Sequence, residues 1–180
     1  LKKHGLIPGE NVEVLTNVQF DLMAGAFTGG KEDYVTLFEP VASAMEQEGK
    51  GYIVASVGEA AGEVPYTAYA ATKSFIEKNR DLIQRFVNAI YKGQQYVATH
   101  SPEEIAKAIK PSFPDTSEEM LATVVKRYKD IKAYAETPVM KESALNRLQD
   151  IMELAGELDK RVVFEELVNN EFAENAVKQK

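Results

Sequence analysis

Residues Asn17 to Pro40 read NVQFDLMAGAFTGGKEDYVTLFEP and contain a helix signal, a stop and a strand signal in succession. Apolar residues recur at helical spacing over 19–28, and the pair Gly29-Gly30 ends that helix. The β-branched and aromatic run at 34–38 predicts a strand covered on both faces, and Pro40 stops it. Ligands bind outside the carboxyl ends of strands in open α/β sheets, so we expect part of a small-molecule cleft here.

The segments around this stretch continue the alternation of strands and helices. Further strands are predicted at 12–15, 52–57 and 66–71, and a helix is predicted at 41–48. The Gly- and Glu-rich segment 58–63 is expected to be a mobile loop. Repeated strand–helix–strand passages are typical of parallel or mixed α/β proteins, so this part of the chain is predicted to be of α/β class.

Beyond Thr72 the pattern changes to helices with clear start and stop signals. N-caps are predicted at four polar residues, Thr72, Asn79, Ser101 and Thr116, the last two within capping boxes. Gly156 should end the helix before it, and one last helix should run from about Val163 past Phe172. The chain is therefore predicted to have two parts, an α/β segment at 1–64 and a crossing strand with a helical remainder at 65–180.

Charge and composition exclude several classes of function. The net charge of −7 argues against nucleic acid as a partner, because phosphate binding needs a clustered excess of Lys and Arg. The sequence contains neither an apolar run of the roughly 20 residues that a membrane helix needs nor a signal peptide. Residues Leu1 to Gly5 resemble the last turn of a helix, so we expect the chain to lack an N-terminal portion of its parent protein.

The sequence predicts no catalytic residue, metal site or cofactor. The absence of cysteine excludes disulfides, thiolate metal ligands and a cysteine nucleophile. His4 and His100 are far apart, and the paired glutamates fall in the first turns of predicted helices, where they complement the helix dipole. Glycines 25, 29 and 30 do not form a dinucleotide fingerprint, because they do not stand between a strand and a helix. A Schiff-base role for Lys73 or Lys110 remains open.

Four residues are candidates for the cleft, each with a structural alternative. Glu39 should lie at the carboxyl edge of the sheet, or it stabilises the start of the helix that follows. Phe38 offers an apolar platform or a core side chain, and Gln19 faces a ligand or solvent at a helix start. Tyr66 follows Pro65 at the predicted crossing, where it stacks on a ligand or packs in the strand. These four side chains are therefore predicted to contact a ligand in a cleft, and none of them is predicted to be catalytic.

An ordered series of segments resembles a known family. The segments are GGKEDYVTLFEP at 29–40, EGKGYIVAS at 48–56, VPYTAY at 64–69, FIEKN at 75–79 and AIYKGQ at 89–94. They resemble the NMT1/THI5-like solute-binding proteins of ABC importers for nitrate, sulfonates, taurine and thiamine-pyrimidine precursors. The resemblance covers nearly the whole chain, and one departure is Arg80, where many relatives have proline.

The resemblance implies a two-lobed, type II periplasmic-binding-protein fold, of which this chain holds a part. Residues 1–64 would form most of the second lobe, and residues 65–180 the return to the first lobe with its C-terminal helices. Carried over by position, the cleft would be lined by Gln19, Phe38, Glu39, Tyr66 and Thr67. Function would be reversible capture of a small organic ligand by lobe closure, followed by delivery to the transmembrane permease, with no bond chemistry.

The resemblance further implies an extracytoplasmic protein, in the periplasm or as a cell-surface lipoprotein held by an N-terminal lipid anchor. Glu39, the tyrosines and one amide favour a neutral or cationic aromatic ligand, such as an aminopyrimidine, over a sulfonate or nitrate, which need donors or cations. The alternative is a biosynthetic enzyme of the same fold, in a pyrimidine or menaquinone pathway. Yeast relatives make a thiamine pyrimidine with a cysteine-rich motif, and this chain has no cysteine.

Overall fold

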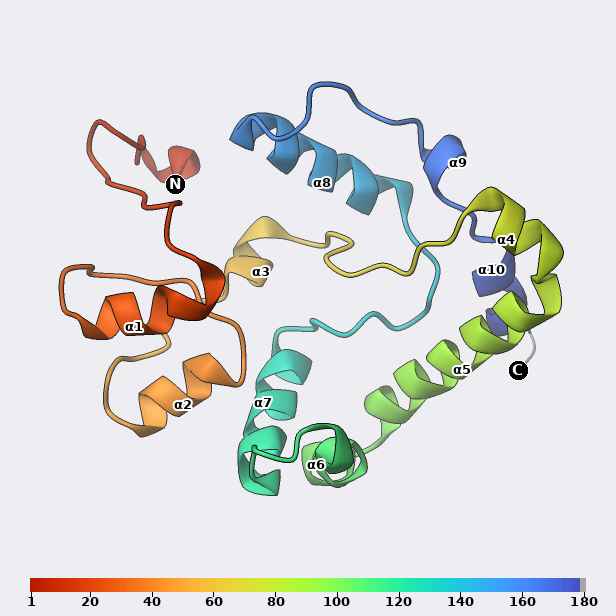
Figure 1. Ribbon diagram of the computed structural model, residues 1–180, viewed down its shortest axis with the longest axis horizontal. Coiled ribbons are helices and arrows are strands. Elements are labelled where there is room, and N and C mark those ends of the chain that lie inside the picture. The colour runs from red at the N-terminus through yellow and green to blue at the C-terminus, as the bar shows by residue number, and fades with distance from the viewer. Residues whose placement is uncertain (179–180) are drawn as a thin grey trace. The chain divides into compact units, whose positions relative to one another are not determined.

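The computed structural model describes residues 1–178, with the backbone alone at Lys2. The chain divides into two compact units, Leu1–Val54 (unit 1) and Ala55–Lys180 (unit 2), and each is described by itself. In Figure 1 each unit consists of helices joined by irregular segments. The helical content agrees with the predicted class, whereas the sheet does not appear.

Unit 1 contains short helices, namely η1 Lys2–His4, η2 Phe20–Leu22, α1 Met23–Thr28 and α2 Val41–Gln47. The helices predicted at 19–28 and 41–48 are thereby confirmed. The Gly29 N–H donates to the Ala26 and Gly25 carbonyls, and Gly30 follows with a φ of +83°. That left-handed conformation is one that glycine adopts at no steric cost, so the double glycine ends α1 as its sequence indicates.

The strands predicted at 12–15, 34–38, 52–57 and 66–71 do not form in the part of the chain that the structure describes. These segments are irregular, and the β-pairing found is a single isolated bridge between Pro8 and Val12. A strand exists only through hydrogen bonds to a neighbouring strand, whatever its side-chain pattern. The Ile53 N–H, for example, donates to the Glu46 carboxylate (3.0 Å) and not to a ladder carbonyl.

Unit 2 is helical from its first residues. Its helices are α3 Val57–Ala61, α4 Lys73–Lys78, α5 Arg80–Thr99, α6 Pro102–Ile109, η3 Lys110–Ser112, α7 Glu118–Asp130, α8 Glu142–Ala155, α9 Phe164–Leu167 and α10 Glu171–Lys178. The prediction of a mobile loop at 58–63 was wrong, because α3 occupies most of it. The Ser56 hydroxyl caps α3 by accepting from the Glu59 N–H (3.2 Å), a signal that the glycines at 58 and 62 concealed.

The helix caps of unit 2 agree with the sequence at two positions and differ at two. Thr72 accepts from the Phe75 N–H, and Ser101 forms a complete capping box with Glu104. The predicted second box does not form, since Ser117 and not Thr116 accepts from the Met120 N–H and the residue at N3 is then Met120, which cannot reciprocate. Asn79 precedes α5 but makes no cap, because its amide donates back to the Phe75 carbonyl (2.8 Å).

The predicted last helix is two helices, α9 and α10, separated by an Asn-Asn pair. The Asn169 side chain accepts from the Glu171 N–H (2.9 Å) at the start of α10. The Asn170 amide pairs with both main-chain groups of Met140, at 3.0 and 2.8 Å. These side chain–backbone hydrogen bonds compete with the hydrogen bonds of a continuous helix, so the helix is interrupted there.

The core of unit 2 lies where helices pack in pairs. α6 lies beside α7 and α10 beside α5 (Figure 1). Some apolar residues of these pairs are almost inaccessible to solvent, namely Tyr91, Ile105, Ala106, Leu121, Val125 and Phe172. Burying a side chain of this size contributes about 1.5–3 kcal/mol, so these pairs dominate the stability of the unit.

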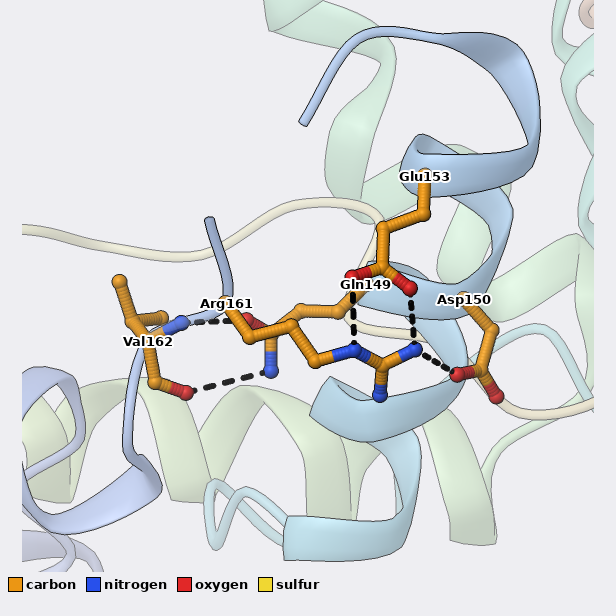
Figure 2. Close-up of polar contacts among 5 residues, drawn as sticks. All are labelled: Gln149, Asp150, Glu153, Arg161 and Val162. Carbon is orange, nitrogen blue, oxygen red and sulfur yellow. Dashed lines mark hydrogen bonds and ion pairs between the residues drawn. The ribbon is translucent and has the colours of Figure 1, made fainter. Parts of the chain in front are cut away.

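A second set of contacts ties irregular segments to α8. Gln149 is only 3% exposed, and its amide pairs with both main-chain groups of Val162, at 2.7 and 3.3 Å. Next to it the Arg161 guanidinium bonds to the Glu153 carboxylate (2.9 and 2.6 Å) and to Asp150 (Figure 2). The hydrogen bond from Arg161 holds the pKa of Glu153 below its ordinary value. The segment after Gly156, which ends α8 in the left-handed conformation, is thus held against that helix.

We expect Gln149→Leu to lower the unfolding free energy by about 1–3 kcal/mol, because it leaves the N–H and C=O of Val162 without partners. Urea unfolding followed by circular dichroism measures this. Arg161→Gln is the matched variant, since it breaks solvent-exposed ion pairs to the same helix and should cost less. A larger loss for Arg161→Gln would contradict the assignment of the anchor to Gln149.

The capping box of α6 makes stability depend on pH. The Ser101 N–H donates to Glu104 Oε2 (2.8 Å), and this bond holds the pKa of Glu104 below its ordinary value. A carboxylate with a lowered folded-state pKa stabilises the fold above the ordinary glutamate pKa of about 4.3, and that contribution is lost as the pH falls. We expect Glu104→Gln to flatten the dependence of unfolding free energy on pH between about 5 and 3. Glu103→Gln, in the same turn, is the control, and identical profiles for both variants would refute the prediction.

Candidate functional site

Glu39 lies immediately before α2, where its carboxylate interacts with the helix start. Glu39 Oε2 accepts from the Ser43 N–H (2.9 Å), and the intervening Pro40 is joined to Glu39 by a cis peptide. A carboxylate at this position also complements the partial positive charge of the helix N-terminus. The structural alternative for Glu39 is therefore realised. Its place in a ligand site stays a prediction, with one carboxylate oxygen already engaged.

An aromatic pair brings two of the predicted site segments together within unit 1. The rings of Phe20 and Phe38 lie with centroids 5.5 Å apart, tilted by 45°. Phe20 directly follows Gln19, whose exposed side chain makes no capping bond although Gln19 is the N-cap residue of η2. Both rings remain accessible, Phe20 at 61% and Phe38 at 44%. Together the two rings expose apolar surface. In the sequence, Gln19 directly precedes Phe20 and Glu39 directly follows Phe38.

Sequence reasoning missed Phe20 as the partner of Phe38, because helical spacing placed Phe20 in the helix predicted at 19–28. The structure gives that residue to η2, whose short turn exposes it. A hint was available in the sequence, since Phe20 and Phe38 each neighbour a polar candidate, Gln19 or Glu39. Local patterns do not, however, reveal that two segments eighteen residues apart place their rings in contact.

Tyr66 and Thr67 belong to unit 2, on an irregular segment between α3 and α4. The Tyr66 N–H donates to the Val64 carbonyl (3.0 Å) across Pro65, which forms a tight three-residue turn. The Tyr66 side chain is 71% exposed, and Thr67 is exposed as well. Strand packing, the alternative for Tyr66, is not seen, and the ring is accessible to a ligand.

The segment that carries Tyr66 is held at both ends by residues that the sequence did not single out. At one end Glu63 contacts two side chains of the α8 region, Lys141 and Arg147. At the other end the Tyr69 ring packs edge-to-face on Phe86 of α5, with centroids 4.9 Å apart. The partners lie far away in the sequence, so no local motif could have indicated them.

Several of the side chains considered for catalysis make structural contacts. Lys110 Nζ donates to the carbonyls of Phe113, Pro114 and Thr116, at 3.3, 2.9 and 2.8 Å, and so ties down the loop after η3. His100 stacks on Tyr96 (centroids 3.6 Å apart) at the end of α5. The paired glutamates lie in the first turns of α6, α7 and α9, as predicted.

Burial raises the pKa of Tyr134, whose ring meets that of Tyr128 edge-to-face.

Two kinds of feature are absent from residues 1–178. No three acidic, histidine or cysteine side chains among them are arranged to hold a metal ion. No helix within the same range has the length and apolar character to cross a membrane.

Comparison with known proteins places these features in a family. Residues 1–111 match the model of the NMT1-like family. The whole chain is 43% identical over 180 residues to a Bacillus subtilis (strain 168) protein named "Putative binding protein YtlA" and spans 54% of that protein's length. No solved structure matches the chain. The family match covers more than half of the chain, and it agrees with the resemblance drawn from the ordered segments. The chain therefore belongs to the NMT1-like family.

Proposed function

We propose that this chain is part of the solute-binding component of an ABC importer, which captures a small organic ligand and delivers it to a permease. The observation that carries the proposal is the 43% identity over the entire chain to a protein named as a binding protein. Binding without chemistry also agrees with the roles of Lys110 and of the paired glutamates, which serve loops and helix starts.

In this proposal the chain contributes to a type II periplasmic-binding-protein fold, with residues 1–64 in the second lobe and residues 65–180 in the first. The protein acts outside the cytoplasm, held at the membrane by an N-terminal lipid anchor. Ligand is taken up by lobe closure, a hinge motion in which binding energy favours the closed state.

The proposed ligand contacts are Gln19, Phe38, Glu39, Tyr66 and Thr67, as the resemblance to the family implies. Exposed rings at Phe20, Phe38 and Tyr66 supply apolar surface for an aromatic ligand. The negative charge of Glu39, next to Phe38 in the sequence, favours a donor group or positive charge on the ligand. These features support an aminopyrimidine over taurine or nitrate, whose anionic groups would meet the Glu39 carboxylate.

Calorimetry with 4-amino-5-hydroxymethyl-2-methylpyrimidine, taurine and nitrate tests the ligand class. We expect the pyrimidine to bind with a Kd of about 1 µM or tighter, near −8 kcal/mol. Glu39→Gln should weaken this binding about tenfold, the loss of one charge-assisted hydrogen bond. The amide can still accept from the Ser43 N–H, so α2 should remain capped.

Glu48→Gln is the matched control, because it removes the same charge from an exposed position at the other end of α2. Binding of taurine or nitrate in place of the pyrimidine would overturn the proposed ligand class. Steady turnover of any of the three would replace the transport role with an enzymatic one.

Phe38 packs on Phe20 and is also proposed to stack on the ligand, and substitutions separate these two roles. Phe20→Leu and Phe38→Leu should show a coupling of about 0.5–1.5 kcal/mol in unfolding free energy, since they remove the same ring contact. If Phe38 also stacks on the ligand, Phe38→Leu should weaken pyrimidine binding about tenfold, by the loss of roughly 1–3 kcal/mol of stacking. Equal affinities of the Phe38→Leu variant and the wild type would leave Phe38 a packing residue only.

A further inference from the structure

Residues Gly62 and Glu63 are fixed against α8 by two cationic side chains. Lys141, which precedes the first turn of α8, donates from Nζ to Glu63 Oε2 (2.8 Å). Arg147, within α8, donates from Nη1 to the main-chain carbonyl of Glu63 (3.2 Å). One residue is thus bonded through its side chain and through its backbone, which fixes both its position and its orientation.

Gly62 is the residue that allows Arg147 to approach so closely. A Cβ atom at position 62 would lie 2.8 Å from Arg147 Nη1 and 3.2 Å from Cζ, inside the normal contact distance. Gly62 also has a φ of +79°, a conformation that disfavours residues with a side chain. The guanidinium therefore lies directly over the Gly62 backbone, and the contact depends on the absence of a side chain there.

The anchored residues begin the segment that carries Tyr66 and Thr67. Only Val64 and Pro65 separate Glu63 from Tyr66, and Pro65 has a fixed φ within the turn closed by the Tyr66 N–H. At its far end the segment is held by the ring of Tyr69 on Phe86. With both ends fixed, the short stretch between them has few conformations left.

We propose that Arg147 and Lys141 are positioning residues for ligand binding, which hold the segment of Tyr66 and Thr67 in its binding conformation through Gly62 and Glu63. The inference rests on the proposed function, in which Tyr66 and Thr67 contact the ligand. Neither cation touches the ligand in this arrangement. Their effect on affinity comes from pre-organisation, since a segment that is already ordered loses less freedom on binding.

The size of the effect follows from populations. When only a fraction of molecules has the binding conformation, the apparent Kd rises by the reciprocal of that fraction. If loss of the anchor reduces the fraction of molecules in the binding conformation to between one third and one tenth, the Kd rises about three- to tenfold. The same loss should accelerate amide hydrogen exchange in residues 62–69 by the factor by which the open population rises, because exchange reports that population.

The variants are Arg147→Gln and Lys141→Gln, singly and together, measured by hydrogen-exchange mass spectrometry and by calorimetry with 4-amino-5-hydroxymethyl-2-methylpyrimidine. Arg85→Gln is the matched control, because Arg85 also belongs to an exposed ion pair, with Asp81 of its own helix. Gly62→Ala is a second route to the same state, since its methyl group displaces the guanidinium and strains the backbone at a φ of +79° while all charges remain. We expect faster exchange at 62–69 and weaker binding in each anchor variant, and neither in Arg85→Gln.

A double-mutant cycle distinguishes positioning from general loss of stability. In a Tyr66→Ala background the Kd should respond little to Arg147→Gln, because the side chain being positioned is gone. An undiminished response there would overturn the proposal, as would unchanged exchange at 62–69 or an equal effect of Arg85→Gln. Faster exchange with unchanged affinity would show that the anchor exists but does not serve binding.

The exchange and binding measurements also separate this proposal from the function on which it rests. If the wild type binds none of the three probes, the proposed function and the affinity effect both fall. The exchange experiment still decides whether Arg147 and Lys141 hold the segment. If the wild type binds the pyrimidine, failure in the anchor variants concerns the positioning role alone.

Discussion

The main-chain groups that helices leave unpaired are the constraint around which unit 2 is organised. Each helix end exposes N–H and C=O groups that cost free energy when they are buried without a partner. Side chains from distant positions satisfy several of them. Lys129 Nζ donates to the carbonyls of Val97 and His100 at the end of α5, at 2.8 and 2.7 Å. The amides of Gln149 and Asn170 pair with both main-chain groups of Val162 and Met140.

These contacts do more than compensate for lost hydrogen bonds to water. Gln149 joins α8 to the irregular segment at Val162, and Asn170 joins two irregular segments to each other, so these stretches of unit 2 acquire defined positions. The exposed ion pairs within α5 and α7 add little, because solvent screens exposed charges. The buried amide pairs and the apolar pairing of α5 with α10 and α6 with α7 therefore account for the order of this unit.

Sequence reasoning succeeded where a structure depends on neighbouring residues. The capping box at Ser101, the cap at Thr72 and the stop at Gly156 are local, and the structure forms them all. It failed where the outcome depends on distant partners. The strand pattern at 34–38 is strong, yet no ladder forms in the described residues because a strand needs another strand to bond.

For the candidate site, the sequence indicated the exposed Tyr66 and the polar neighbours of the aromatic pair. The sequence also indicated that Glu39 could stabilise the start of the following helix, and the hydrogen bond from the Ser43 N–H supports that role. It could not supply the partners of these segments. Phe20 meets Phe38, and Arg147 reaches Glu63, through tertiary contacts that leave no periodic trace in the sequence. The family relationship came from the order of several modest segments and not from any single motif.

The three carbonyls around Lys110 have a consequence for the chemical reactivity of the chain. An ammonium group has three N–H donors, and the loop after η3 can engage all three. Acylating reagents attack only a neutral amine that is free to turn toward them. Lys110 should therefore react more slowly than exposed lysines such as Lys126, whose Nζ contacts a single carboxylate. Its rate of labelling would report how often the loop at 113–116 opens, a measure of local motion that needs no ligand and no substitution.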